Sequence, residues 1–129
     1  MAIQNDSKLS NKEFSDILKR RIYNWILRLI KFIDSLPKND SVCRITGDQL
    51  IRCGTSTGAN YVEAIAGSST KDFTNFLTHA LKSANESKFW LALLRDTDRG
   101  NKDEINYLLA EIMEIANILG SSVKTLKDK

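Results

Sequence analysis

Few residues of this 129-residue chain have side chains that could carry out chemistry. His79 is the only histidine, so a Ser-His or Cys-His nucleophilic site would have to be built around it. Its neighbours at helical spacing, Asn75 and Lys82, are polar, which suits a solvated or interface position better than a general base. The two cysteines lack metal-ligand spacing, and neither a Glu-x-x-His pair nor a glycine-rich phosphate loop is present. The sequence therefore predicts no catalytic, cofactor or metal site, and a protein that is not an enzyme.

Phosphate binding is the second chemistry to consider, because basic side chains gather near the N-terminus. Residues 1–36 hold seven of the nineteen Lys and Arg residues but only four of the sixteen Asp and Glu residues, so the net charge of +3 lies in this segment. At about 100° per residue, four of them share one side of a helix: Arg20, Arg21, Arg28 and Lys31. Such a basic ridge could bind the backbone of RNA or DNA by counterion release without reading sequence. An ordinary solvated face is the alternative.

A row of polar residues at steps of three and four lies farther along the chain. Its members are Arg52, Ser56, Asn60 and Glu63. They form either a solvated face or a polar seam at a subunit contact, where Arg52 and Glu63 could pair with a neighbouring chain. Gly54 and Gly58 interrupt the same stretch at a cost of about 1 kcal/mol each in a helix, so another backbone should approach here, within one bundle or between subunits.

Four capped amphipathic helices should position these groups. Capping residues precede four segments with apolar residues every three or four positions, and the segments span about 11–36, 42–66, 70–97 and 102–127. The predicted caps are Ser10, Asp40 or Ser41, Ser69 and Asn101. Connections of two to six residues predict an all-α, antiparallel up-down-up-down four-helix bundle. Residues 10–127 then form a single domain, and residues 1–9 a flexible N-terminus.

The first and third predicted helices carry more apolar surface than one bundle can bury. Phe89, Trp90 and Leu93 continue a face of the third helix that begins polar. Because a monomer should not leave such residues in water, we expect a homo-oligomer whose closed, ring-like assembly covers them.

Three features of the sequence indicate the cellular compartment in which the protein is expected. The first residues lack the basic and apolar regions of a signal peptide, and no apolar run has the roughly 20 residues of a membrane span. Cys43 and Cys53, ten residues apart on one helix, would lie about 15 Å from each other, too far for a disulfide. These features predict a reduced, cytoplasmic protein without a membrane partner.

A longer pattern resembles a known family. It runs from Gln49-Leu50-Ile51-Arg52 through Ser56-Thr57-Gly58-Ala59-Asn60-Tyr61-Val62-Glu63-Ala64 and Ser69-Thr70-Lys71-Asp72-Phe73 to Ala80-Leu81-Lys82-Ser83-Ala84-Asn85-Glu86. The pattern is similar to that of the four-helix bundle proteins named after intervening sequences in bacterial 23S ribosomal RNA genes, over roughly residues 14–120. Cys53-Gly54 stands where serine-alanine is common in that family, and Tyr61 where isoleucine is common.

The resemblance implies a bacterial cytoplasmic protein that forms a homopentameric ring and has no known catalytic activity. The chain is also similar to the accessory proteins of diversity-generating retroelements, basic pentameric bundles that bind nucleic acid and a reverse transcriptase. Two functions are therefore expected. The first is nucleic-acid binding through the basic face of the first helix. The alternative is a protein-interaction scaffold, or accessory subunit, that docks a reverse transcriptase.

Overall fold

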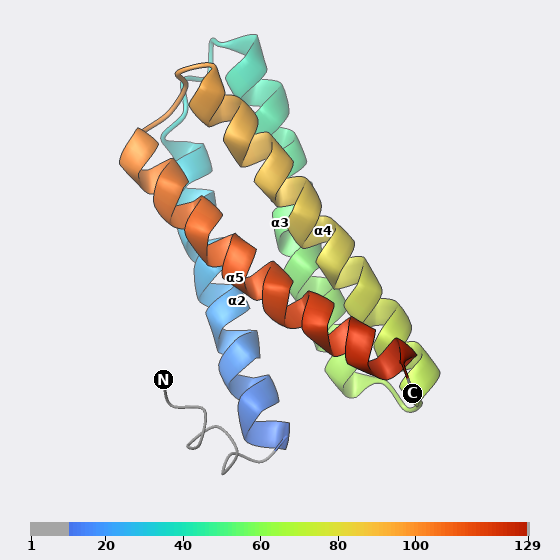
Figure 1. Ribbon diagram of the computed structural model, residues 1–129. Coiled ribbons are helices and arrows are strands. Elements are labelled where there is room, and N and C mark those ends of the chain that lie inside the picture. The colour runs from blue at the N-terminus through green and yellow to red at the C-terminus, as the bar shows by residue number, and fades with distance from the viewer. Residues whose placement is uncertain (1–10, 129) are drawn as a thin grey trace.

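The computed structural model describes residues 11–128, which form four helices and no strand (Figure 1). The helices are α2 (Asn11–Asp34), α3 (Ser41–Ala66), α4 (Thr70–Asp96) and α5 (Lys102–Lys127). The chain reverses direction at each short connection, so that the helices lie alongside one another (Figure 1). The prediction of an all-α fold with four helices is confirmed. The predicted cap at Ser10 and the predicted flexible segment 1–9 lie outside the described residues.

The predicted caps of the last three helices are confirmed. In each, the side-chain oxygen of the cap accepts a hydrogen bond from the amide three residues later, which satisfies a donor that the first turn leaves free. The pairs are Asp40 with Cys43 (2.9 Å), Ser69 with Asp72 (3.1 Å) and Asn101 with Glu104 (2.9 Å). The first helix ends at Asp34, two residues before the predicted end.

The core lies between all four helices, and each helix contacts two others. α3 packs against α2 and α4, and α5 packs against α4 and α2, so that α2 and α4 occupy opposite corners of the bundle. The fully buried side chains include Leu29, Leu50, Leu91 and Ile112, one from each helix. Within residues 11–128, the structure contains no helix both long and apolar enough to cross a bilayer.

Three glycines of α3 form the surface on which α2 packs, and we call them the glycine seam: Gly47, Gly54 and Gly58. A Cβ atom on Gly54 would lie 2.4 Å from Cδ2 of Leu29, and one on Gly58 would lie 2.7 Å from Cδ1 of Ile26. Both distances are too short for a real contact, so α2 occupies the space that larger residues would need. α2 of the same chain therefore packs against Gly54 and Gly58.

Candidate nucleic-acid interface

Arg21, a member of the predicted basic ridge, faces α5. Its Nε and Nη2 atoms donate to the two carboxylate oxygens of Glu111, the second over 2.9 Å, and Nη2 also lies 3.0 Å from Glu114. Only 32% of the Arg21 side chain is exposed. A bidentate pair of this kind is among the stronger ion pairs, and it neutralises the arginine within the chain.

Arg28 is paired in the same way one heptad later. Its Nε and Nη2 atoms donate to Glu104 over 2.6 and 3.0 Å, and its guanidinium carbon lies 3.6 Å from the centre of the Tyr107 ring. The ion pair and the cation–π contact hold this side chain against α5. The predicted ridge of four neighbouring free charges is therefore reduced, because two of its members already bind carboxylates.

Sequence reasoning did not identify Glu104 and Glu111 as partners of these arginines, although the residue spacing predicts the pairing. Arg21 and Arg28 are seven residues apart, and so are Glu104 and Glu111. Two antiparallel helices with matched heptad spacing bring both pairs together at once.

These pairs shift the titration of the glutamates. The hydrogen bond from Arg21 lowers the pKa of Glu111, and the hydrogen bond from Arg28 lowers the pKa of Glu104, while partial burial opposes both shifts. The same contact with Glu111 raises the pKa of Arg21. Since folding lowers the pKa of both carboxyl groups, the unfolded chain binds more protons than the folded one in mildly acidic solution.

We therefore expect the free energy of unfolding to fall as the pH drops from about 5 to about 3, below the ordinary glutamate pKa of about 4.3. Urea denaturation at several pH values measures this dependence. Arg21→Gln together with Arg28→Gln should flatten it, whereas Arg20→Gln should leave it unchanged, because no described residue pairs with Arg20. An equal effect of Arg20→Gln would contradict the assignment.

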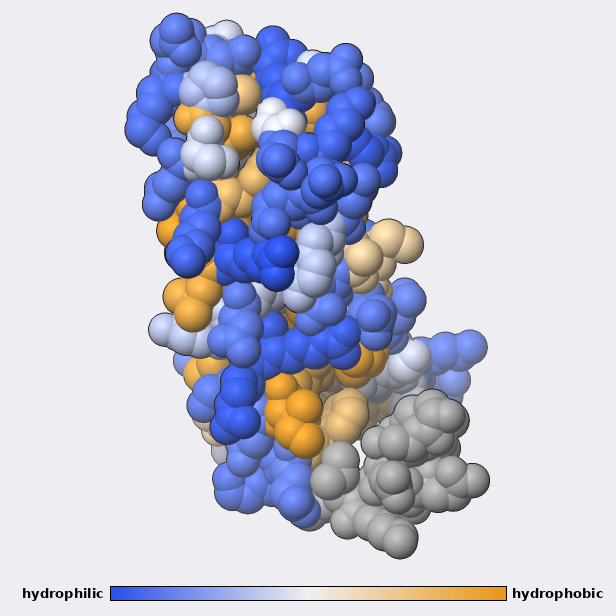
Figure 2. Space-filling view, turned by 90° about the vertical axis from the view of Figure 1, so that its left-hand side faces the viewer, coloured by the Kyte–Doolittle hydropathy of each residue, from blue (hydrophilic) through white to orange (hydrophobic). Residues whose placement is uncertain are grey.

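The rest of the predicted ridge lies on the outer face of α2. Arg20 and Lys31 are exposed, and neither has an ion-pair or hydrogen-bond partner among residues 11–128. Ile17 and Leu27 follow the same face at helical spacing and are 51% and 47% exposed. Figure 2, which views this side of the molecule, shows apolar side chains between hydrophilic ones. The outer face of α2 is therefore mixed, with free cations beside apolar side chains.

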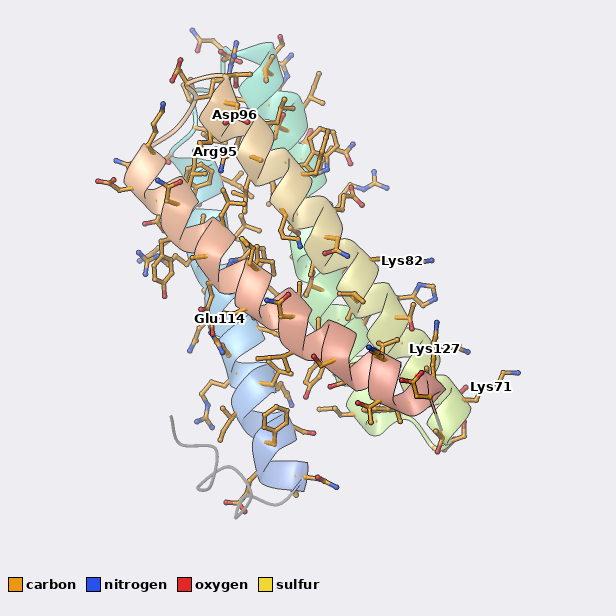
Figure 3. The ribbon with its side chains drawn as sticks, viewed as in Figure 1. Lys71, Lys82, Arg95, Asp96, Glu114 and Lys127 are labelled. Carbon is orange, nitrogen blue, oxygen red and sulfur yellow. The ribbon has the colours of Figure 1, made fainter. Side chains whose placement is uncertain are left out.

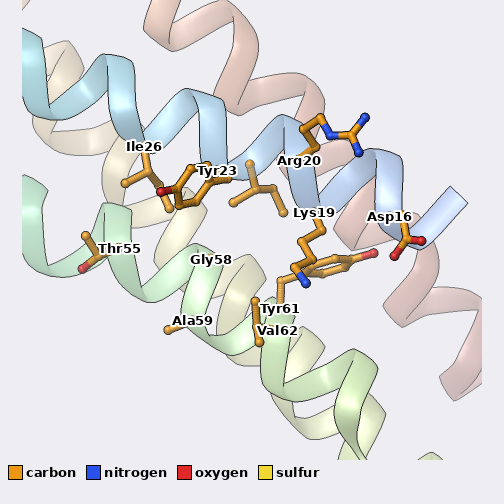
Figure 4. A pocket seen from close by; sticks show the side chains of 11 residues that line it. Asp16, Lys19, Arg20, Tyr23, Ile26, Thr55, Gly58, Ala59, Tyr61 and Val62 are labelled. Carbon is orange, nitrogen blue, oxygen red and sulfur yellow. The ribbon is translucent and has the colours of Figure 1, made fainter. Parts of the chain in front are cut away.

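A groove of about 560 Å³ runs between α2 and α3, beside the glycine seam (Figure 4). Tyr23 and Ile26 line it from α2, and Gly58 and Val62 line it from α3, while Lys19 lies at its edge. The Tyr23 side chain is 60% exposed. The groove is mainly apolar, and the charged side chains that line it, Asp16, Lys19 and Arg20, come from α2. It therefore suits a protein side chain better than a phosphate group.

The predicted polar row divides into two parts. Asn60 Nδ2 donates to the backbone oxygen and to Oγ of Ser56, both over 2.9 Å, and Ser83 of α4 donates to the same Oγ over 3.0 Å. Ser56 and Asn60 are half-buried, and the bond from Ser83 to Ser56 ties α3 to α4 within the chain. Arg52 and Glu63 are exposed and have no partner among the described residues, so their charges are available to another molecule.

Of the three apolar residues predicted to need cover, Phe89 is the most exposed, at 60%. Trp90 and Leu93 are half-buried. Trp90 packs edge-on against Phe89 with 5.0 Å between ring centres, and its indole nitrogen donates to Glu86 over 3.0 Å. We call Phe89 and Trp90, with the Glu86 carboxylate beside them, the Phe89 patch.

The residues considered for catalysis are not brought together. His79 is exposed on α4, and Cys43 and Cys53 are buried free thiols on α3. Burial raises the pKa of the Cys53 thiol, which disfavours the reactive thiolate. In the part of the chain that the structure describes, no three His, Cys, Asp or Glu side chains are grouped so that they could hold a metal ion.

Comparison with known proteins agrees with this architecture. A crystal structure of a protein of unknown function from the S23 ribosomal protein family of Bacteroides thetaiotaomicron matches with a TM-score of 0.78 and 32% identity, covering 85% of this chain and 97% of that one. A search of the curated proteins finds no match. Residues 8–121 match the family model described as 23S rRNA-intervening sequence protein. Because this match includes α2, α3 and α4 and most of α5, the chain belongs to the 23S rRNA-intervening sequence protein family.

Proposed function

We propose that this protein is a non-enzymatic homo-oligomer that binds the backbone of RNA or DNA in the bacterial cytoplasm. The supporting observation is the pair of free cations on the outer face of α2, Arg20 and Lys31, which no carboxylate among residues 11–128 neutralises. Arg21 and Arg28 contribute less than the sequence suggests, because Glu111 and Glu104 hold them. Contacts of this kind neutralise phosphates without reading bases.

The proposed oligomer is a ring in which the Phe89 patch of one copy enters the α2–α3 groove of the next. Phe89 and Tyr23 are the most exposed large apolar side chains of the described residues, and α4 and α2 lie on opposite corners of the bundle. Two different patches on different sides favour head-to-tail contacts, which close into a ring when the rotation allows. The groove is lined by two cations, Lys19 and Arg20, and one carboxylate, Asp16, so its charge is complementary to that of Glu86 in the patch. We propose five copies, the number that the family resemblance implies.

A ring increases the effect of each cation. Arg20 and Lys31 then recur in every subunit, and a single nucleic-acid molecule contacts several copies at once. Such multivalency raises overall affinity without any additional type of contact.

A salt titration of binding to structured RNA and to duplex DNA tests the proposed function. We expect clear binding at about 50 mM salt and a steep loss of affinity towards 200 mM, because released counterions drive the association. Arg20→Glu with Lys31→Glu should weaken binding at least about tenfold, since two phosphate contacts become repulsive. Neither side chain has a partner within the described chain, so the variant should fold normally.

The matched control is Lys38→Glu with Arg44→Glu, which changes the net charge equally, at the connection between α2 and α3 and in the first turns of α3. If this control weakens binding as much as the α2 variant, affinity depends on overall charge and not on the outer face of α2. If the unaltered protein binds neither RNA nor DNA at about 50 mM salt, the proposed function is wrong.

The alternative is a scaffold that docks a protein, such as the reverse transcriptase of a diversity-generating retroelement. The mixed character of the outer α2 face favours it, because Ile17 and Leu27 beside Arg20 resemble the composition of a protein interface. A reverse-transcriptase gene and a repeat pair beside this gene would support the alternative. Binding of that partner should then be lost in Ile17→Glu with Leu27→Glu and retained in Arg20→Gln with Lys31→Gln.

A further inference from the structure

A second groove, between α4 and α5, brings together side chains that can donate hydrogen bonds. It has a volume of about 440 Å³. The donors that line it are Asn85 and Lys88 from α4 and Asn117, Ser121 and Lys124 from α5. None of the five side chains has a hydrogen-bond or ion-pair partner among residues 11–128, and no carboxylate lines the groove. Five free donors around one hollow form a surface suited to an anion.

The lysines of this groove have no carboxylate partner among the described residues, unlike two of the arginines of α2. Arg21 and Arg28 are neutralised by Glu111 and Glu104, but Lys88 and Lys124 face amides and a hydroxyl group. Figure 3 shows that further lysines project from the same half of the bundle, whereas Glu114 lies on the side of α5 that faces α2. These additional lysines are Lys71 and Lys82 of α4 and Lys127 of α5.

The spacing of the two lysines indicates the size of the anion. Gly120 lies opposite Leu81, since a Cβ on Gly120 would be 3.9 Å from a Leu81 methyl group. Lys88 follows Leu81 by seven residues on α4, and Lys124 follows Gly120 by four residues on α5. Because the two helices are antiparallel, the two lysines lie in opposite directions from this contact. At a rise of 1.5 Å per residue, their backbones are about 16 Å apart along the groove. Two lysines at this separation can each contact a different phosphate group of one strand.

The groove also differs from the proposed subunit contacts in polarity. No large apolar side chain with the exposure of Tyr23 or Phe89 lines it. The proposed ring contacts are made by Tyr23 and Phe89, and neither residue lines the α4–α5 groove.

We propose that the α4–α5 groove binds the phosphodiester backbone of a nucleic-acid strand, with Lys88 and Lys124 each contacting a phosphate group and with Asn85, Asn117 and Ser121 donating to phosphate oxygens between them. This site rests on the proposed nucleic-acid binding, but it is separate from Arg20 and Lys31. It places two phosphate contacts in the C-terminal half of the chain, where the sequence has no excess of positive charge.

The test is a salt titration of binding to a short single-stranded RNA by the intact protein and by Lys88→Gln with Lys124→Gln. Losing two phosphate contacts should reduce the slope of log affinity against log salt by about 1.4, at about 0.7 per contact for a single strand. Lys88→Arg with Lys124→Arg should keep the slope, and so should the matched control, Lys38→Gln with Arg44→Gln. Circular dichroism verifies that each variant is folded.

A second readout locates the strand. In NMR spectra, the side-chain amide signals of Asn85 and Asn117 should shift as RNA is added. If the groove variant keeps the original slope, or if these signals do not move, the inference is overturned. When that result is accompanied by lost binding in Arg20→Gln with Lys31→Gln, the proposed function still stands. If the unaltered protein binds no RNA, both proposals fail.

Discussion

Gly54→Leu should lower the free energy of unfolding by about 3 kcal/mol, the upper part of the range for an overpacked core. The Cβ alone would lie 2.4 Å from Leu29, which is fully buried, and 3.4 Å from the ring of Trp25, which is 2% exposed. Both side chains are buried, so the larger side chain can be accommodated only if they repack or α2 shifts away from α3. Urea denaturation at a fixed protein concentration measures the change.

The control is Gly120→Ala on α5, where a Cβ would meet a Leu81 methyl group at 3.9 Å, an ordinary contact. There the alanine should stabilise the helix by up to about 1 kcal/mol, because it removes the cost of a glycine inside a helix. If Gly54→Leu were as harmless as this control, α2 would not pack on the glycine seam as described.

The second large effect concerns assembly. In solution we expect a mass of five times the 14.6 kDa chain, and we expect Phe89→Glu or Tyr23→Glu to reduce it to that of the free chain. Each substitution places a carboxylate in a contact that the proposed ring buries, and an unpaired buried charge costs several kcal/mol. Sedimentation equilibrium or light scattering measures the mass.

Mixing the two variants distinguishes the kinds of contact. If the contact is head-to-tail, the intact groove of Phe89→Glu can still receive the intact patch of Tyr23→Glu, so the mixture should form dimers and no ring. Met113→Glu, at a residue of α5 that is 51% exposed, is the matched control and should leave the mass unchanged. A monomeric unaltered protein, or disassembly caused by the control, would contradict the proposed ring.

The four helices could be predicted from the sequence because their signals are local. Asp40, Ser69 and Asn101 cap helices where short polar segments precede apolar stripes, and the structure confirms all three. The family resemblance is also confirmed, because residues 8–121 match that family. The sequence left open which surface covers Gly54 and Gly58, since a glycine pair signals a close approach without identifying the partner.

The candidate site was less predictable, because the charge of a side chain depends on what faces it. The arginines at 21 and 28 were correctly placed on α2, but a helical wheel of one segment cannot show the glutamates of another. The α4–α5 groove was missed for the same reason: its two lysines come from helices whose charges nearly cancel along the sequence. In both cases the deciding contacts join residues far apart in the chain.

The contacts between α2 and α5 have a consequence for how the chain matures. Arg28 binds a residue 76 positions later, the indole of Trp25 donates to the carbonyl of Leu108 83 positions later, and Arg21 binds a residue 90 positions later. A ribosome makes α2 first and α5 last, so these groups of α2 lack their partners until nearly all of the protein has been synthesised. Neighbouring helices can pair as they emerge, but the bundle closes only at the end of translation.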